Sequence, residues 1–225
     1  MIRPSIRWRM FSPYAAVWKG GNVTRLTADD WARAALDALS GGGLAAVAVE
    51  PLAVRLGATK GSFYWHFRNR RALLEAALAL WERDTESVIA DLDEIADPAR
   101  RMRTLLQSAL SDPVDAAISF RLISEADDPA VAEVARRVSA RRLGYMQASL
   151  EQLGVPPGLA RRRVVAGYGI YLGIAALRRI GATDEPAASF IDQAMTEMGI
   201  PGGRAEDAQP MASRPAATDR RRRSS

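Results

Sequence analysis

The residues best suited to chemistry lie at positions 59–67, where the chain reads Thr-Lys-Gly-Ser-Phe-Tyr-Trp-His-Phe. Successive residues of an α-helix turn by about 100°, so Phe63 and Phe67 share one face, which we expect to be buried. Gly61 and Trp65 then point outward. The residues that flank this outward face are Ser62, Tyr64 and His66. Large aromatic side chains gathered on an outward face indicate a binding surface.

The chemistry that such a face fits is the reading of DNA in its major groove. Glycine permits close approach, aromatic edges can meet thymine methyl groups, and hydroxyl groups reach phosphates or bases. Lys60 adds a positive charge beside the N-terminus of the helix, where phosphate is favoured. The alternative is that Tyr64, Trp65 and His66 pack against neighbouring helices, and their spacing alone leaves this open.

A second basic feature follows at positions 68–71, which read Arg-Asn-Arg-Arg. Asn69 is a suitable helix cap, and the arginines beside it oppose the helix dipole, which favours negative charge in the first turn. A DNA phosphate would supply that charge, whereas solvated surface arginines are the alternative. The predicted DNA-binding residues are Thr59, Lys60, Gly61, Ser62, Tyr64, Trp65, His66, Arg70 and Arg71.

Short helices must position these residues. Thr27 and Asp30 have the spacing of a capping box at the start of a first helix, which the glycines at 41–43 end. The next helices are predicted over residues 49–56, 59–67 and 69–81. Because Gly57 makes a tight turn between the second and the third, these two have the pattern of a helix-turn-helix.

The rest of the chain also reads as helices, without a useful alternating pattern, so the predicted fold class is all-α. Residues 164–177 are apolar nearly all the way round, and a helix of this kind must be buried on every side. Together with a last helix at 187–198, it predicts a dimer contact built from four helices, two from each chain. A monomer whose core covers both helices is the alternative.

Composition narrows the possible functions. The chain has a net charge of +5, no cysteine and a single histidine, His66. Thiolate catalysis, disulfides and multi-histidine metal sites are thereby excluded, and we expect neither a metal nor a cofactor. Residues 1–84 carry 12 Lys or Arg against 7 Asp or Glu, a basic front end that favours a polyanionic partner.

Two further classes are disfavoured. No apolar run approaches the roughly 20 residues that span a bilayer, so we expect no membrane partner and a cytoplasmic location. Glu125, Asp127 and Asp128 could in principle serve as acids or bases. No second group is placed to shift the pKa of these carboxyls, so we do not expect an enzyme.

The stretch at positions 52–67, Leu-Ala-Val-Arg-Leu-Gly-Ala-Thr-Lys-Gly-Ser-Phe-Tyr-Trp-His-Phe, resembles the DNA-binding signature of the tetracycline-repressor (TetR) family, and residues 69–74 continue the likeness. One departure is Ala48, where the family often places a Ser or Thr cap. The resemblance implies an all-helical homodimer that binds a double-stranded, palindromic DNA operator. It also implies that the second helix of the motif enters the major groove and that Arg70 or Arg71 reaches phosphate.

The resemblance further implies a small-molecule ligand in the C-terminal core, which changes the separation of the two DNA-reading heads. We expect a largely apolar ligand. Candidate lining residues, all of types that are more often ordinary core, are Met102, Leu106, Phe120, Tyr145, Met146, Tyr168 and Tyr171.

The expected organisation has four parts. Residues 1–24 form a flexible arm or precede the true start, 25–70 form the helix-turn-helix domain, 71–200 form the ligand-binding and dimerisation domain, and 201–225 form a disordered basic tail. The expected function is sequence-specific transcription regulation, with a repressor that its ligand releases from the operator. The alternative is a non-specific or architectural DNA-binding protein without a ligand.

Overall fold

The computed structural model describes residues 26–111, 113–185 and 188–200, and within these ranges every regular element is helical. The predicted all-α fold is confirmed. The helices are α1 (Ala28–Gly42), the short 3-10 helix η2 (Leu44–Ala46), α2 (Val49–Arg55), α3 (Lys60–His66), α4 (Arg70–Asp93), α5 (Pro98–Ser111), α6 (Pro113–Ser124), α7 (Pro129–Gln152), α8 (Pro157–Arg179) and α9 (Ala188–Glu197). The arm predicted over 1–24 and the tail predicted over 201–225 lie outside the described residues.

Helix α1 begins with the predicted capping box. The Thr27 hydroxyl accepts a hydrogen bond from the Asp30 amide over 3.2 Å, and the Asp30 carboxylate accepts one from the Thr27 amide over 2.8 Å. Gly43, with φ of 69°, ends the helix in a conformation that L-residues rarely adopt. This end brings the chain back through η2 to the helix-turn-helix.

Helices α2 and α3 form the predicted helix-turn-helix. Gly57 makes the turn between them with φ of 61°, and the Thr59 hydroxyl caps α3 by accepting from the Ser62 amide over 3.2 Å. Ala48 provides no side-chain cap for α2, as its residue type dictates. Helix α4, predicted to begin near Asn69 and to continue through Trp81, runs on to Asp93, and its buried residues extend through Leu92.

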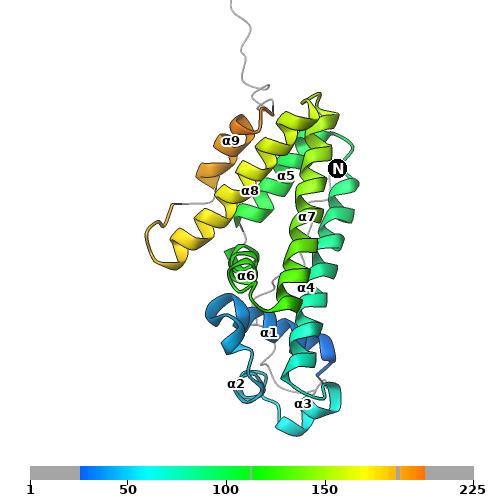
Figure 1. Cartoon of the computed structure of the whole chain (residues 1–225), viewed down its shortest axis with the longest axis vertical. Coiled ribbons are helices and arrows are strands. Elements are labelled where there is room, and N and C mark those ends of the chain that lie inside the picture. The colour runs from blue at the N-terminus through cyan, green and yellow to red at the C-terminus, as the bar shows by residue number, and fades with distance from the viewer. Residues whose placement is uncertain (1–25, 112, 186–187, 201–225) are drawn as a thin grey trace, which may run out of the picture.

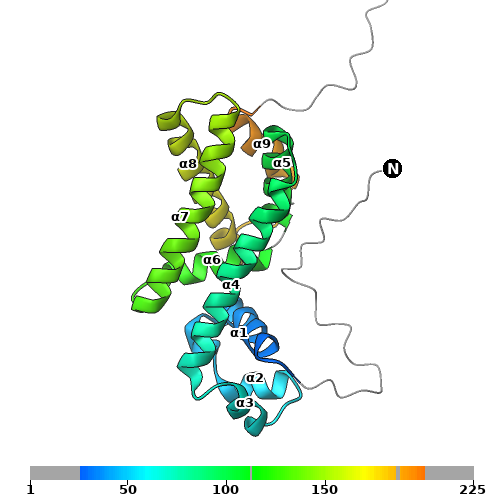
Figure 2. The same cartoon turned by 90° about the vertical axis from the view of Figure 1, so that its right-hand side faces the viewer.

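The molecule is elongated, with α1, α2 and α3 at one end and α5, α8 and α9 at the other (Figures 1 and 2). Helices α4 and α7 run along the long axis, and α6 lies at the level where the two ends meet (Figure 1). The buried core divides in the same way. One cluster centres on Trp31, Phe63 and Trp81, and the other on Met102, Leu150 and Val164. Helix α4 spans both ends, so one continuous helix connects the end that contains α5, α8 and α9 to the end that contains α1, α2 and α3.

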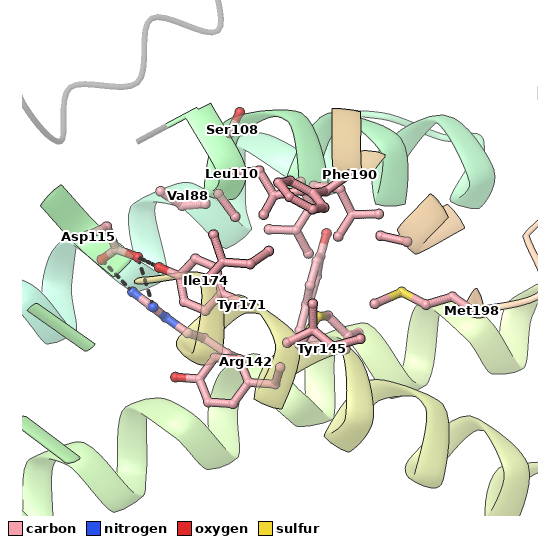
Figure 3. Close-up of a pocket in the computed structure, with 18 of the residues that line it drawn as sticks. Val88, Ser108, Leu110, Asp115, Arg142, Tyr145, Tyr171, Ile174, Phe190 and Met198 are labelled. Carbon is pink, nitrogen blue, oxygen red and sulfur yellow. Dashed lines mark hydrogen bonds and ion pairs between the residues drawn. The ribbon is translucent and has the colours of Figure 1, made fainter. Parts of the chain in front are cut away.

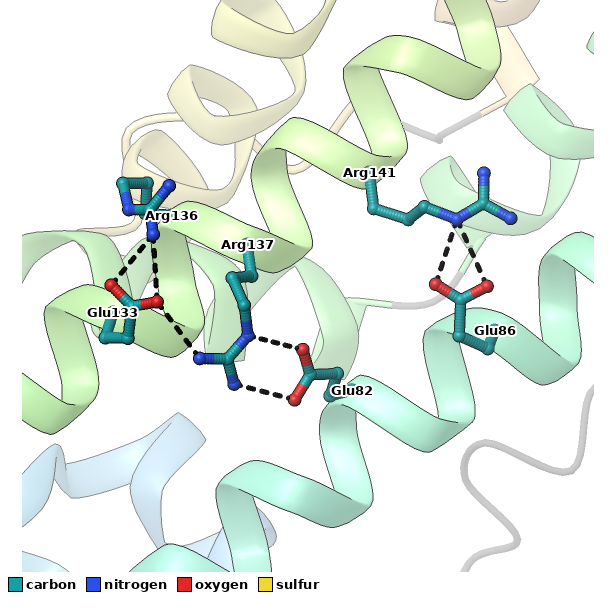
Figure 4. A network of polar contacts seen from close by, with 6 residues as sticks. All are labelled: Glu82, Glu86, Glu133, Arg136, Arg137 and Arg141. Atoms are coloured by element: carbon teal, nitrogen blue, oxygen red, sulfur yellow. Dashed lines mark hydrogen bonds and ion pairs between the residues drawn. The ribbon is translucent and has the colours of Figure 1, made fainter.

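Surface ion pairs fasten α7 to α4. The Arg137 guanidinium donates to both carboxylate oxygens of Glu82, over 2.8 and 2.9 Å, and Arg141 does the same to Glu86, over 2.9 and 3.1 Å (Figure 4). Arg137 also reaches Glu133 on its own helix. Exposed pairs of this kind contribute only about 0–1 kcal/mol each, so they set the register of the two helices more than they stabilise the fold.

Candidate nucleic-acid interface and internal cavity

The two faces of α3 differ as predicted. Phe63 is fully buried and packs edge-on against Trp31, with 5.4 Å between ring centroids, and Phe67 is buried beside it. Tyr64 and Trp65 extend into solvent, with 61% and 71% of their surface exposed. Packing of these two aromatic side chains in the interior is thereby excluded. They form an outward surface at the far end of the molecule.

His66 lies differently from the other predicted DNA-binding residues. It is half-buried, and its Nε2 lies 2.9 Å from the carbonyl oxygen of Leu26, just before α1. For this side chain the packing alternative describes the structure, because it ties the end of α3 to the start of α1. Sequence spacing could not reveal a contact across 40 residues.

The N-terminal part of α3 exposes Thr59, Lys60 and Gly61. Lys60 pairs with the Glu50 carboxylate of α2, which joins the two helices of the motif. A Cβ atom added at Gly61 would meet only the Thr59 hydroxyl, at 3.6 Å, which is an ordinary contact. The fold itself therefore has room for a side chain at this position.

The arginines that open α4 find negative partners within the protein. Arg70 donates to the carbonyl oxygens of Leu44 and Val47, and Arg71 donates to the Asp128 carboxylate over 2.6 Å. Asn69 caps the helix as predicted, accepting from the Ala72 amide over 2.9 Å. These carbonyl and carboxylate oxygens already accept hydrogen bonds from Arg70 and Arg71, so phosphate contact by either arginine remains a prediction.

A cavity of about 320 Å³ lies at the other end of the molecule, enclosed by α4 to α9 (Figure 3). Of the residues predicted to line a ligand site, Leu106, Tyr145, Met146, Tyr168 and Tyr171 line it. Two others do not line it: Met102 is buried in the core, and Phe120 lines a second cavity nearby. The walls are mostly apolar, in keeping with the predicted ligand chemistry.

Sequence reasoning missed the buried charges at one end of this cavity. Asp115 of α6 accepts from both terminal nitrogens of Arg142, each over 3.0 Å, and from the hydroxyl of Tyr171 over 2.7 Å (Figure 3). Trp81 Nε1 donates to it over 3.1 Å. Arg142 and Tyr171 follow Asp115 by 27 and 56 residues in the chain, and no local sequence pattern indicates that they contact it.

The same cluster perturbs the ionisation of its members. Burial alone would raise the pKa of Asp115, but the Arg142 guanidinium outweighs it and holds that pKa below its ordinary value. Burial, joined by the Asp115 charge, raises the pKa of Tyr171 well above its ordinary value. The pair thus stays ionised and Tyr171 stays protonated at neutral pH.

Helix α8 keeps an apolar face outside the core. Val165, Ile170 and Leu177 are each about half exposed, and a Cβ added at Gly169 or Gly173 would meet nothing within 4 Å. On α9 and just after it, in contrast, Ile191, Met195 and Met198 are buried within the chain, and Phe190 and Ala194 pack partly buried against the same core. The unpartnered apolar surface of the predicted helix pair is therefore on α8.

The other candidate groups have structural partners. Glu125 accepts from the Leu44 amide over 2.7 Å, and Asp128 caps α7. Within the ranges that the structure describes, no three His, Cys, Asp or Glu side chains gather in a way that could hold a metal ion. In the same ranges, no helix is both long enough and apolar enough to cross a membrane.

Comparisons with known proteins agree with this arrangement. Residues 33–77 match the family model described as bacterial regulatory proteins, tetR family. The class A tetracycline repressor protein from transposon 1721 of Escherichia coli is 44% identical over 68 residues, which cover 29% of this chain. The aligned segment spans 32% of the length of that repressor.

Solved structures share the fold over a longer stretch. A TetR transcriptional regulator from Legionella pneumophila is 14% identical with a TM-score of 0.66, over 75% of this chain and 96% of that one. A transcriptional regulator from Saccharomonospora viridis, in complex with choline, is 15% identical with a TM-score of 0.65, over 76% of this chain and 95% of that one. The tetR signature thus lies on the α1 to α4 region that contains the helix-turn-helix, and the two solved regulators share the fold of the chain around it.

Proposed function

We propose that this protein is a transcription regulator that reads a DNA operator with α3. The exposed aromatic pair Tyr64 and Trp65 supports this proposal, because both side chains are exposed on α3, which lies at one end of the elongated molecule (Figure 1). The buried faces of α3 fix the orientation of that pair through Phe63 and Phe67. In this proposal Thr59, Lys60, Gly61 and Ser62 lie against the DNA together with the aromatic pair.

Gly61 is the observation that carries the proposal. A glycine within a helix costs up to about 1 kcal/mol relative to alanine. The protein has space for a Cβ at this position, so its own packing gives no reason for the glycine. Close approach by an external partner does give a reason, and a DNA groove is the partner that fits the neighbouring side chains.

The exposed apolar face of α8 supports a homodimer. Val165, Ile170 and Leu177 would be covered by the same face of a second copy, and Gly169 and Gly173 would let the two backbones approach closely. A two-fold dimer presents two copies of α3, so its operator is palindromic. The site of action is then the cytoplasm, where the DNA lies in a bacterium.

The cavity of about 320 Å³ supports ligand-controlled release, with a small molecule binding between α4 and α9. A ligand shifts the protein only by its differential affinity for two arrangements. The long helix α4 connects the cavity to α3, since it borders the cavity and only three residues, 67–69, separate it from α3. In this proposal the unliganded protein represses and the ligand-bound protein leaves its operator.

Fluorescence anisotropy on the DNA upstream of the gene, against a scrambled duplex at two salt concentrations, tests the proposal. A specific regulator prefers the native duplex by about 10³-fold or more. Equal binding to both duplexes, falling steeply with salt, supports a non-specific or architectural DNA-binding protein instead.

A further inference from the structure

A second cavity, of about 500 Å³, lies where the end of α1 meets α6 and α8. Its charged wall consists of Arg121 from α6 and of Arg178 and Arg179 from the last turn of α8. The rest of the wall is mostly apolar. Three arginines from two helices thus line one hollow that borders the end of α1.

These arginines have few anionic partners. Arg121 lies 3.9 Å from the Glu125 carboxylate, which also accepts a hydrogen bond from the Leu44 amide. In the ranges that the structure describes, neither Arg178 nor Arg179 forms an ion pair with a carboxylate. Arg178 donates to the main-chain carbonyl of Glu185 over 2.9 Å. The cavity is therefore electropositive.

Two of the arginines share a single main-chain acceptor. Arg121 and Arg179 both donate to the Gly41 carbonyl at the end of α1, over 3.3 and 3.4 Å, which are long distances for charged donors. The Nε of Arg121 is buried and has no hydrogen-bond partner. A buried donor without an acceptor costs about 1–3 kcal/mol. Both observations point to an acceptor that comes from outside the chain.

Helix dipoles compensate only part of the positive charge of these three arginines. The C-termini of α1 and α8 each carry roughly half a negative charge. Together with the one carboxylate of Glu125 they leave about one positive charge uncompensated among three arginines. A monoanionic group in the cavity would balance it.

The second cavity adjoins the first one. They share the wall residues Ala109, Leu110, Tyr171 and Ile174. Among the described residues that line the first cavity, the buried charges of Asp115 and Arg142 are already satisfied, because both Asp115 oxygens and both terminal nitrogens of Arg142 are bonded within the protein. An apolar chain therefore suits the first cavity and an anionic group suits the second.

We propose that the effector is an anionic amphiphile, with its apolar chain in the first cavity and a carboxylate or phosphate head group between Arg121, Arg178 and Arg179. This deepens the proposed function and rests on it for the effect on DNA. The head group takes over hydrogen bonds that Arg121 and Arg179 give to Gly41. The end of α1 thereby loses two donors, and α1 packs directly on the helix-turn-helix through Trp31 and Phe63.

Calorimetric titration of the full chain with four ligands of equal chain length tests this inference. The ligands are decanoate, decyl phosphate, 1-decanol and decylammonium, each below its micelle concentration. We expect at least one anion to bind about tenfold or more tightly than the alcohol, an advantage of about 1.4 kcal/mol. The comparison of the two anions identifies the head group.

Substitutions test whether the preference for anions over 1-decanol arises in the second cavity. The double variant Arg178→Gln/Arg179→Gln, at positions near the surface, is expected to lose the anion advantage while it still binds 1-decanol. Arg161→Gln removes an exposed charge from the same helix, away from both cavities, and is expected to keep the advantage. Loss of the advantage in this control as well would overturn the assignment to the second cavity.

The remaining outcomes separate the two proposals. Equal binding of the alcohol and the anions, or preference for decylammonium, overturns the anionic site and leaves the apolar cavity of the proposed function intact. Binding of none of the four overturns the anionic amphiphile, and the DNA-reading part of the proposed function is then judged by the anisotropy measurement alone. If the anion preference holds but the same preparation does not bind its upstream DNA specifically, the binding site stands and the regulatory function fails.

Discussion

The guanidinium of Arg71 donates to the carboxylate of Asp128 over 2.6 Å, joining the first turn of α4 to the first turn of α7. Asp128 also caps α7, accepting from the Ala130 and Val131 amides. The hydrogen bond from Arg71 is the main cause that holds the pKa of Asp128 below its ordinary value. The arginine predicted to contact a DNA phosphate thus already has an anionic partner, and the two anions must compete for it.

This competition gives a first prediction. Asp128→Asn keeps a good capping side chain but removes the charge, so it is expected to raise DNA affinity by a few-fold. Arg71→Ala is expected to lower affinity for all duplexes alike and to reduce the salt slope by about one. Anisotropy titrations over a salt series measure both. An unchanged slope in Arg71→Ala would remove Arg71 from the DNA interface.

Glycine at position 61 gives a second prediction, in which stability and binding move in opposite directions. Gly61→Ala is expected to stabilise the fold by about 0.5–1 kcal/mol, because the site has room and alanine is the better helix former. It is also expected to weaken specific DNA binding, since the added methyl group enters the groove. Urea unfolding and anisotropy check the two effects.

Gly144→Ala is the matched control for this experiment. Gly144 is exposed in the middle of α7, and a Cβ there meets nothing within 4 Å. Alanine at this position is expected to stabilise the fold without any change in DNA affinity. Undiminished operator binding by Gly61→Ala would mean that nothing approaches that position.

The buried pair of Asp115 and Arg142 gives a third prediction. Asp115→Ala leaves the Arg142 charge buried without its counterion and is expected to cost about 3–5 kcal/mol of unfolding free energy. The double variant with Arg142→Met is expected to recover most of that loss. Glu86→Ala removes an exposed partner from the neighbouring ion pair with Arg141 and is expected to cost about 0–1 kcal/mol. Similar losses in Asp115→Ala and Glu86→Ala would contradict the burial argument.

Tyr171 gives a fourth prediction, in alkaline solution. Its pKa is raised in the folded state by burial and by the Asp115 charge, so folding favours the protonated form. The resulting stability is present below the ordinary tyrosine pKa of about 10 and is lost as the pH rises through the folded-state value. The unfolding free energy is therefore expected to fall more steeply above pH about 10 in the wild type than in Tyr171→Phe. Parallel slopes would show that Tyr171 ionises as readily folded as unfolded.

Local signals in the sequence predicted the fold and the outward surface well. Thr27 with Asp30, Thr59 and Asn69 cap their helices because a cap bonds amides only two or three residues ahead. The helical period placed Phe63 inside and Trp65 outside for the same reason. Such features depend on neighbours along the chain, which the sequence displays directly.

Contacts between distant segments could not be predicted in this way. The bonds from His66 to Leu26 and from Arg71 to Asp128 span 40 and 57 residues, and they changed the environment of predicted DNA-binding groups. The cavity posed the same difficulty. Met102 and Leu106 share one helical stripe, yet only Leu106 reaches the cavity, because the cavity borders the second half of α5 and Met102 lies one turn nearer the start of that helix.

Selection from a pool of random-sequence duplexes, run in parallel with the wild type and with Trp65→Ala, tests the central claim most directly. Trp65 is mostly exposed, so its removal is expected to leave stability nearly unchanged, and circular dichroism verifies the fold. We predict that the wild type enriches an inverted-repeat sequence and that Trp65→Ala does not. Absence of an enriched sequence with the wild type, or enrichment of the same sequence by both proteins, would contradict the claim that α3 reads DNA through this surface.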